Sequence, residues 1–116
     1  MKKFTGGCHC KAVRYEVSAD FTKAIQCNCS HCNIKGLLLD FIPAENFKLL
    51  SGEDDLTEYR FNKKHIAHLF CKHCGVESFA RGAKPDGTKI VAVNLRCIDD
   101  LDLATLTILN VDGKSL

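Results

Sequence analysis

The chain has 116 residues, which suits one compact domain and is too short for two ordinary ones. Hydrophobic residues make up 46% and charged residues 26%, a balance that excludes a disordered chain. The formal net charge is +2, from 16 Lys and Arg against 14 Asp and Glu, so neither a nucleic acid nor a membrane surface is expected as a partner.

The beginning of the chain does not have the pattern of a secretion signal. Two lysines at positions 2 and 3 are followed by Gly6, Gly7 and cysteines, where a signal peptide would be apolar. The longest apolar runs, such as residues 37–39, are too short to cross a bilayer. We therefore expect a cytoplasmic protein, in which clustered cysteines hold metal more often than they form disulfides.

Short alternating or β-branched runs predict strands along the chain. Val13, Tyr15 and Val17 alternate with polar residues, which is the pattern of a strand buried on one face. The remaining runs predict strands over residues 37–42, 57–61, 65–70, 90–95 and 105–111. Pro43 ends the first of these, and residues 43–46 are expected to form a turn or one helical turn.

No window of a dozen residues carries an apolar stripe of helical period. Many short strands at regular spacing therefore predict a mainly β domain over residues 1–116. Two segments echo each other, because residues 8–10 and 71–74 each place a cysteine pair at a turn that leads into an apolar run. Zinc knuckles are built in this way.

The eight cysteines carry the strongest chemical signal. They form four groups: Cys8 and Cys10; Cys27, Cys29 and Cys32; Cys71 and Cys74; and Cys97 alone. Zinc takes either four thiolates in a closed tetrahedral site or three protein ligands with the fourth position open. Two pairs supply four ligands and the triplet supplies three. Spacing alone does not decide which pairs share an ion, and Cys97 or His31 could close the triplet.

Two other uses of these cysteines are less favoured. Four disulfides would need an oxidising compartment, and cysteines one residue apart cannot readily bridge to each other. Iron–sulfur clusters are disfavoured because the spacings differ from the common ferredoxin runs. Zinc is therefore the expected metal.

Four stretches carry a family resemblance, in the same order along the chain. They are Gly7-Cys8-His9-Cys10-Lys11-Ala12-Val13-Arg14-Tyr15; Cys27-Asn28-Cys29-Ser30-His31-Cys32 with Gly36; Tyr59-Arg60-Phe61 with His68-Leu69-Phe70-Cys71-Lys72-His73-Cys74-Gly75-Val76; and residues 93–99 with Asp112-Gly113-Lys114. They resemble the GxCxCGxVxY, CxCSxCRxxG and YxF…HxFCxxCGV segments and the later landmarks of the glutathione-dependent formaldehyde-activating (GFA) family, which includes the centromere protein V type. The resemblance covers nearly the whole chain.

This resemblance implies a zinc-stabilised Mss4-like β-tent of short antiparallel sheets. It also implies a division of the cysteines between two zinc ions. Cys8, Cys10, Cys71 and Cys74 would hold a structural zinc, and Cys27, Cys29 and Cys32 would hold a second zinc at the active site. The implied activity is that of a carbon–sulfur lyase, which adds glutathione or another thiol to formaldehyde or a related aldehyde. The product with glutathione is S-(hydroxymethyl)glutathione.

Two positions depart from the family pattern. Lys11 stands where the first motif usually has Gly, and Asn33 stands where the second usually has Arg. The second departure removes a cation beside the triplet, so Lys35 becomes the first candidate to meet a substrate carboxylate.

Several residues near the cysteines are expected to be structural. His9, His31 and His73 should be exposed, with only His31 close enough to the triplet for proton transfer. Gly36 and Gly75 should supply positive φ at turns, and Cys97 should be a buried apolar residue rather than a ligand. No catalytic residue is assigned beyond the open zinc site. The alternative function is a structural zinc module that binds another protein.

Overall fold

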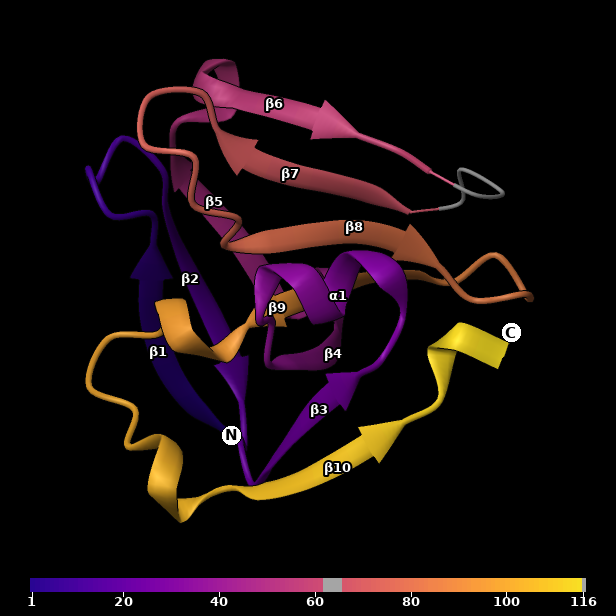
Figure 1. Cartoon of the computed structure of the whole chain (residues 1–116). Coiled ribbons are helices and arrows are strands. Elements are labelled where there is room, and N and C mark those ends of the chain that lie inside the picture. Colours follow the sequence, from indigo (N-terminus) through magenta and orange to yellow (C-terminus); the bar gives the residue numbers. More distant parts are fainter. Residues whose placement is uncertain (62–65, 116) are drawn as a thin grey trace.

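The computed structural model describes residues 1–61 and 66–115, and its architecture is mainly β, as predicted. Two sheets account for the strands of the described part (Figure 1). One has three antiparallel strands in the order β1-β2-β5, namely β1 (Lys2–Gly7), β2 (Arg14–Ala19) and β5 (Phe47–Ser51). The other has seven strands in the order β10-β3-β4-β9-β8-β7-β6. Its members are β3 (Lys23–Cys27), β4 (Leu39–Pro43), β6 (Leu56–Tyr59), β7 (Ala67–Cys71), β8 (Phe79–Ala83), β9 (Lys89–Asn94) and β10 (Thr107–Val111).

The predicted strands overlap β2, β4, β6, β7, β9 and β10, although residue 65 of the fourth prediction lies outside the described residues. The turn predicted at residues 43–46 is a single 3₁₀ turn at Ala44–Asn46. Strands β1, β3, β5 and β8 were not predicted. Buried and exposed positions do not alternate regularly in β1, β3 and β8, and in β5 the exposed position 50 is an apolar Leu, which hides the alternation in the sequence. Their strand structure comes from pairing with neighbours rather than from a local pattern.

One strand pairing differs from the antiparallel expectation. Strand β10 runs parallel to β3, with Thr107 opposite Lys23 and Val111 opposite Cys27. A parallel pair needs a crossover of about a dozen residues, and residues 95–106 supply it between β9 and the outer edge of β3 (Figure 1). The chain therefore returns after β9 to the segment that carries the cysteine triplet.

The main core lies between the two sheets and is centred on aromatic rings. The ring centroid of Tyr15 is 5.0 Å from that of Phe47 and 5.9 Å from that of Phe79. Val13, Tyr15 and Val17 are fully buried, which confirms the alternation predicted for β2. The Tyr15 hydroxyl donates to the Ser78 carbonyl at 3.4 Å, so its polar end is paired within the core.

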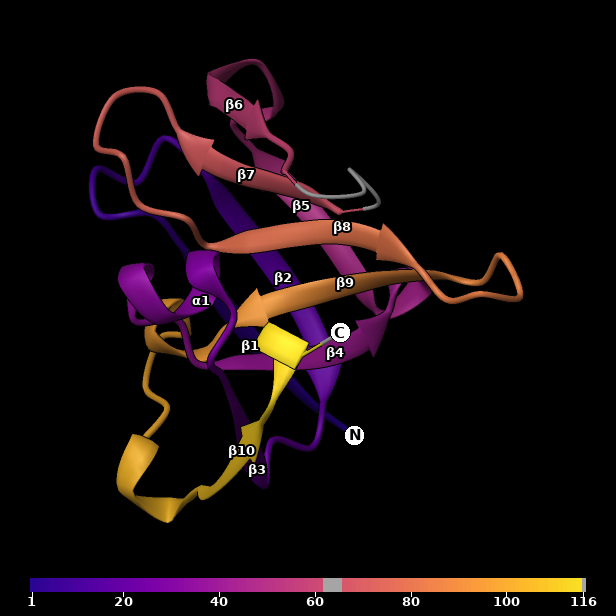
Figure 2. The ribbon, with the colours of Figure 1, turned by 45° about the vertical axis from the view of Figure 1, so that its right-hand side comes forward.

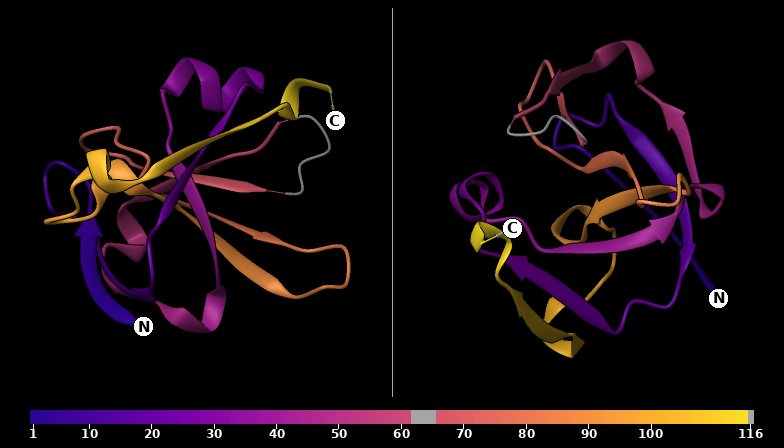
Figure 3. Two further views of the ribbon diagram at one scale, coloured as in Figure 1. Left: turned by 90° about the horizontal axis from the view of Figure 1, so that it is seen from below. Right: turned by 90° about the vertical axis from the view of Figure 1, so that its right-hand side faces the viewer.

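A second, smaller apolar cluster lies on the other face of the seven-stranded sheet. Leu38 and Ile42 belong to the main core, whereas Leu37 and Leu39 join Cys32, Ala80 and Ala92 in this smaller cluster. The apolar run predicted over residues 37–42 is thus buried on both faces of its sheet. Figures 1 and 3 show the short helix α1 (Ser30–Lys35) on this side of the sheet. In the described residues, no helix is both long and apolar enough to cross a membrane.

Candidate metal centres

Four cysteines from two distant turns converge on one point. Cys8 and Cys10 lie in the turn between β1 and β2, while Cys71 ends β7 and Cys74 lies in the turn after it. The two turns lie side by side (Figures 1 and 2). All four Sγ atoms are within 4.8 Å of one another, so they form one potential ligand set.

The spacing of these sulfurs fits a tetrahedral zinc ion. The Cys10 Sγ is 3.7 Å from the Cys8 Sγ and 3.6 Å from the Cys71 Sγ. Zn–S bonds of about 2.3 Å place the sulfurs of a tetrahedral site about 3.8 Å apart, whereas a disulfide needs about 2.0 Å. All eight cysteines are free thiols in the structure. The donor set therefore suits a metal ion and not a disulfide.

The thiols of this four-cysteine set compete for ionisation. Burial opposes the thiolate of Cys74, but hydrogen bonds from the backbone N–H groups of Cys10 and Val76 lower its pKa to about 6. The Ala12 N–H favours the thiolate of Cys10, yet burial and hydrogen bonds with the other thiols raise its pKa to about 12. A divalent cation would allow all four sulfurs to ionise together.

The two turns share a left-handed backbone position but place different residues there. Gly75 adopts φ 79°, as expected for a glycine in a turn. Lys11 adopts φ 69°, at the position where the family motif usually has Gly. A side chain in this left-handed conformation is unfavourable, so the departure at Lys11 affects the conformational energy of the turn and leaves the cysteine set unchanged.

The cysteine triplet is built by the end of a strand and the start of a helix. Cys27 is the last residue of β3, Cys29 is the N-cap of α1, and Cys32 lies in the first turn of that helix. The Cys32 N–H donates to the Cys29 Sγ at 3.4 Å, which caps the helix, and Gly36 ends it at φ 67° as expected. This local geometry brings the three Sγ atoms within 4.8 Å of one another.

Ionisation within the triplet is uneven. Burial opposes the thiolate of Cys29, but hydrogen bonds from the N–H groups of Cys32 and His31 and from neighbouring thiols lower its pKa. Burial raises the pKa of Cys32, and the adjacent Cys29 and Cys27 raise it further. The three donors therefore fit a metal ion, whose charge would stabilise all three thiolates.

Among the described residues, neither candidate for a fourth ligand joins the triplet. The His31 ring is turned toward Glu77, with its Nε2 3.0 Å from a carboxylate oxygen. The Cys97 Sγ lies 4.0 Å from the Glu77 carbonyl oxygen, and burial raises the pKa of Cys97 to about 11. Cys97 is only partly buried, so it is less enclosed than expected. The donor group assembled around Cys27, Cys29 and Cys32 has three members in the part of the chain that the structure describes.

The C-terminal turn covers one side of the triplet. Asn28 holds this turn through three hydrogen bonds: its N–H to the Val111 carbonyl, its side-chain amide to Asp112, and its side-chain oxygen from the Lys114 N–H. Gly113 lies so close that a Cβ there would overlap the Cys27 sulfur. The right-hand view of Figure 3 shows this turn beside α1. Glycine at position 113 is thus required by the space around the triplet.

Gly113→Ala should weaken metal binding at the triplet about tenfold, because either Cys27 or the C-terminal turn must move. Competition between the zinc-loaded protein and a chromogenic chelator measures this affinity. Gly82→Ala is the matched control, since a Cβ at Gly82 would make an ordinary 3.5 Å contact with Ile66. Equal zinc affinities of the two variants would contradict the packing argument.

Glu77 is a buried carboxylate that connects α1 to the seven-stranded sheet. Its oxygens lie 3.0 Å from the His31 Nε2, 3.4 Å from the Lys35 Nζ and 3.5 Å from the His68 Nδ1. Burial disfavours its charge, but the neighbouring His68, the hydrogen-bonded His31 and the charge of Lys35 lower the pKa of Glu77. Phe61 stacks on both histidine rings. This cluster fixes the helix that carries Cys32.

Two expectations for α1 are changed by this cluster. His31 is buried rather than exposed, because its ring faces Glu77 and stacks on Phe61. His9 and His73 are exposed, as expected. The Lys35 ammonium pairs with Glu77 and lies over the Phe70 ring, so the structure gives it a partner within the protein.

The nitrogens of His31 and His68 and a Glu77 oxygen also lie within 4.8 Å of one another. Such a set could hold a metal, but Lys35 already supplies a cation to the carboxylate. Sequence reasoning did not single out Glu77. Its one signal is a charged residue in the short polar step between the apolar residues Val76 and Phe79.

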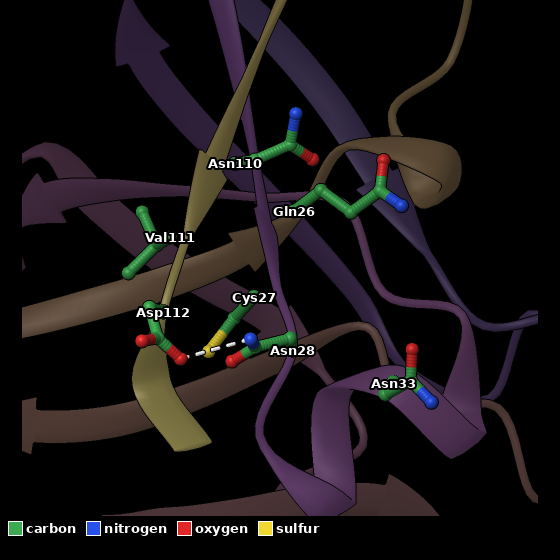
Figure 4. A pocket seen from close by; sticks show the side chains of 7 residues that line it. All are labelled: Gln26, Cys27, Asn28, Asn33, Asn110, Val111 and Asp112. Atoms are coloured by element: carbon green, nitrogen blue, oxygen red, sulfur yellow. Dashed lines mark hydrogen bonds between the residues drawn. The ribbon is translucent and has the colours of Figure 1, made fainter. Parts of the chain in front are cut away.

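Two pockets adjoin the triplet at Cys27. The larger, of about 310 Å³, is lined by Cys27, polar residues of β3 and β10, and Asp112 (Figure 4). The smaller, of about 100 Å³, lies between Cys27, Cys32 and Arg96. Arg96 was also missed, although it stands within one of the segments that carry the family resemblance.

Comparisons with known proteins agree with this architecture. The family model described as "Glutathione-dependent formaldehyde-activating enzyme" matches residues 3–108. A crystal structure of a Rhodobacter sphaeroides protein, a structural genomics target, superposes with a TM-score of 0.77. The two sequences are 24% identical, and the match covers 90% of this chain and 99% of that one. This likeness shows a shared fold.

Proposed function

This chain belongs to the family of glutathione-dependent formaldehyde-activating enzymes, because the family model spans nearly all of it. From this premise we propose that it binds glutathione or another small thiol beside Cys27, Cys29 and Cys32. We further propose that it joins the thiol reversibly to formaldehyde or a related aldehyde. In this proposal Cys8, Cys10, Cys71 and Cys74 hold a structural zinc, and the triplet holds the second of two zinc ions per chain.

The reaction balances without an oxidant or a reductant. The thiol sulfur forms a bond to the carbonyl carbon, and the electron pair of the C=O double bond moves to the oxygen. The oxygen then takes up one proton, which replaces the proton lost by the thiol. The reverse reaction breaks the carbon–sulfur bond, which is why such an enzyme is classed as a carbon–sulfur lyase.

One observation carries the proposal: the three-cysteine set adjoins two pockets, and its described donors leave room for a further ligand. Zinc bound there would lower the pKa of an entering thiol and so favour the nucleophilic thiolate near neutral pH. The chain itself supplies the three cysteine donors and the polar side chains in the walls of both pockets. Gly113 and the Asn28 hydrogen bonds cover the side of Cys27 that faces the C-terminal turn.

Calorimetry on the zinc-loaded protein tests this function. Glutathione should bind with release of a proton, so the measured enthalpy should depend on the ionisation enthalpy of the buffer. S-methylglutathione should bind more weakly and without this dependence, because it has no thiol proton. Cys29→Ser should abolish the proton release, since Cys29 belongs to the triplet.

Two outcomes would contradict the proposal. Equal binding of both ligands would mean that the thiol does not meet the triplet. Binding of neither would favour the alternative of a structural zinc module for protein–protein interaction. A formaldehyde-exchange assay with and without the protein then separates a catalyst from a thiol carrier, because thiols and aldehydes also combine unaided.

A further inference from the structure

The two pockets at the triplet share part of their lining around Cys27. Both are lined by Gln26, Cys27 and Asn33, so they meet on this cysteine. One extends along β3 and β10 toward Asp112, and the other extends between α1 and the turn that carries Arg96. A ligand whose middle lies at Cys27 can therefore place one end in each pocket.

The two pockets carry opposite charges. Arg96 is the cation in the lining of the smaller pocket, and its Nε donates to the Gly36 carbonyl at 3.3 Å. That bond anchors the guanidinium, and its two terminal nitrogens have no partner among the described residues. Asp112 is the anion of the larger pocket, and it accepts hydrogen bonds from Asn28 at 2.9 Å and Ser115 at 2.7 Å. In the described part of the chain, no cation pairs with Asp112.

Amide side chains line the surface between these charges. Gln26 and Asn33 belong to both pockets, and Asn28 and Asn110 belong to the larger one (Figure 4). Each amide offers both donors and an acceptor, which matches the two faces of a peptide group. A bare aldehyde or a thiol without peptide bonds would leave most of these groups unused.

We propose that this surface recognises both ends of a thiol tripeptide of the glutathione type, an inference that rests on the proposed function. The glycine end, which is small and carries a single negative charge, occupies the smaller pocket with its carboxylate on Arg96. The γ-glutamyl end, which is larger and carries both an ammonium group and a carboxylate, occupies the larger pocket with its ammonium near Asp112 and its carboxylate toward the amide donors of that pocket. The cysteine thiol then lies at Cys27.

Arg96 also takes the role that was expected from the sequence for a cation at position 33 or 35, namely to meet a substrate carboxylate. Asn33 leaves no cation at the usual position of the motif, and Lys35 is paired with Glu77. Arg96 supplies a planar fork of donors, which suits a carboxylate better than an ammonium group does. It reaches the smaller pocket from the turn at Leu95–Cys97, and its Nε bond to the Gly36 carbonyl holds it at the C-terminal end of α1.

The glycine end is tested by comparing glutathione with its glycine ethyl ester on the zinc-loaded protein. The wild type should bind glutathione about tenfold more tightly than the ester, because the ester lacks the charge that meets Arg96. Arg96→Met should bind both ligands equally, and Arg96→Lys should show an intermediate preference. Lys48→Met, which removes an exposed charge from the three-stranded sheet, should keep the tenfold preference.

The γ-glutamyl end is tested with a glutathione analogue that lacks the amino group. The wild type should bind this analogue several times more weakly than glutathione, and Asp112→Asn should remove that difference. Asparagine keeps an oxygen to accept the hydrogen bond from Asn28, so the turn stays anchored. Zinc content equal to that of the wild type shows that each variant keeps both sites.

The outcomes separate this proposal from the proposed function. Suppose that glutathione releases a proton on binding, but the wild type binds glutathione and the ester equally, or Arg96→Met keeps the wild-type preference for glutathione. Either result would overturn the tripeptide recognition and leave the proposed function intact. S-methylglutathione and its ester provide the second comparison, because they do not need a thiol at the triplet. If they show the Arg96-dependent preference while glutathione releases no proton, the recognition stands and the function fails. If none of these ligands binds, both the tripeptide recognition and the proposed function are contradicted.

Discussion

Cys71→Ser should leave the protein unfolded at 25 °C, whereas Cys29→Ser should leave it folded. Cys71 belongs to the set that joins the β1–β2 turn to the turn after β7, and its sulfur meets that of Cys10 across 61 residues of chain. Structural zinc sites in small domains contribute about 10–16 kcal/mol, comparable to or larger than the roughly 5–15 kcal/mol by which a native domain is stable. Cys29 belongs to a local set, and the strands of the core do not depend on it.

Circular dichroism and elemental analysis on protein purified without added metal provide the measurements. The wild type should hold about two zinc ions and Cys29→Ser about one, with the β-sheet spectrum retained. Cys97→Ser is the matched control, because Cys97 lies outside both cysteine sets, and it should keep both ions. Equal collapse of Cys71→Ser and Cys29→Ser would mean that both ions are structural. A metal-free protein with four disulfides would contradict the whole zinc assignment.

Glu77→Ala should destabilise the folded protein by about 3–5 kcal/mol, because it leaves a buried ionic cluster without its anion. His31 and Lys35 would lose their common partner, and both belong to α1. The helix also carries Cys32, so zinc at the triplet should be released more readily than zinc at the four-cysteine set. Urea denaturation measures the first effect and chelator competition the second.

Glu58→Ala is the control for this substitution. Glu58 is an exposed carboxylate on β6 that accepts hydrogen bonds from Arg60, and such surface pairs contribute little to stability. Its loss should therefore change neither the free energy of unfolding nor the zinc content appreciably. A similar loss of stability in Glu58→Ala and Glu77→Ala would mean that the buried cluster does not fix α1.

The sequence predicts best where the pattern is local. The alternation at Val13, Tyr15 and Val17 predicts β2, because burial on one face of a strand has a period of two residues. Helix α1 has six residues, too few to show a helical period, so its existence rests on the N-cap at Cys29 and on packing. The parallel pairing of β10 depends on a crossover, and strand patterns do not encode the direction of a partner.

The candidate site shows the same limit. Cysteine spacing indicates which residues could hold metal, but Glu77 and His31 are 46 residues apart and their contact exists only in the folded chain. A histidine between two cysteines therefore gave the wrong expectation of exposure. Arg96 and Gly113 belong to the site for the same reason, since the crossover and the C-terminal turn bring them to Cys27.

The difference in span between the two cysteine sets bears on the order of events during synthesis. Cys27, Cys29 and Cys32 leave the ribosome almost together, so a nascent chain can capture an ion there before any sheet exists. The other set stays incomplete until Cys74 has been translated. Bringing its two turns together then costs the conformational entropy of closing the long loop between them. Under the proposed zinc assignment, the turn between β1 and β2 would wait for the middle of the chain to complete its site, and zinc supply at that moment would limit how fast the newly made protein matures.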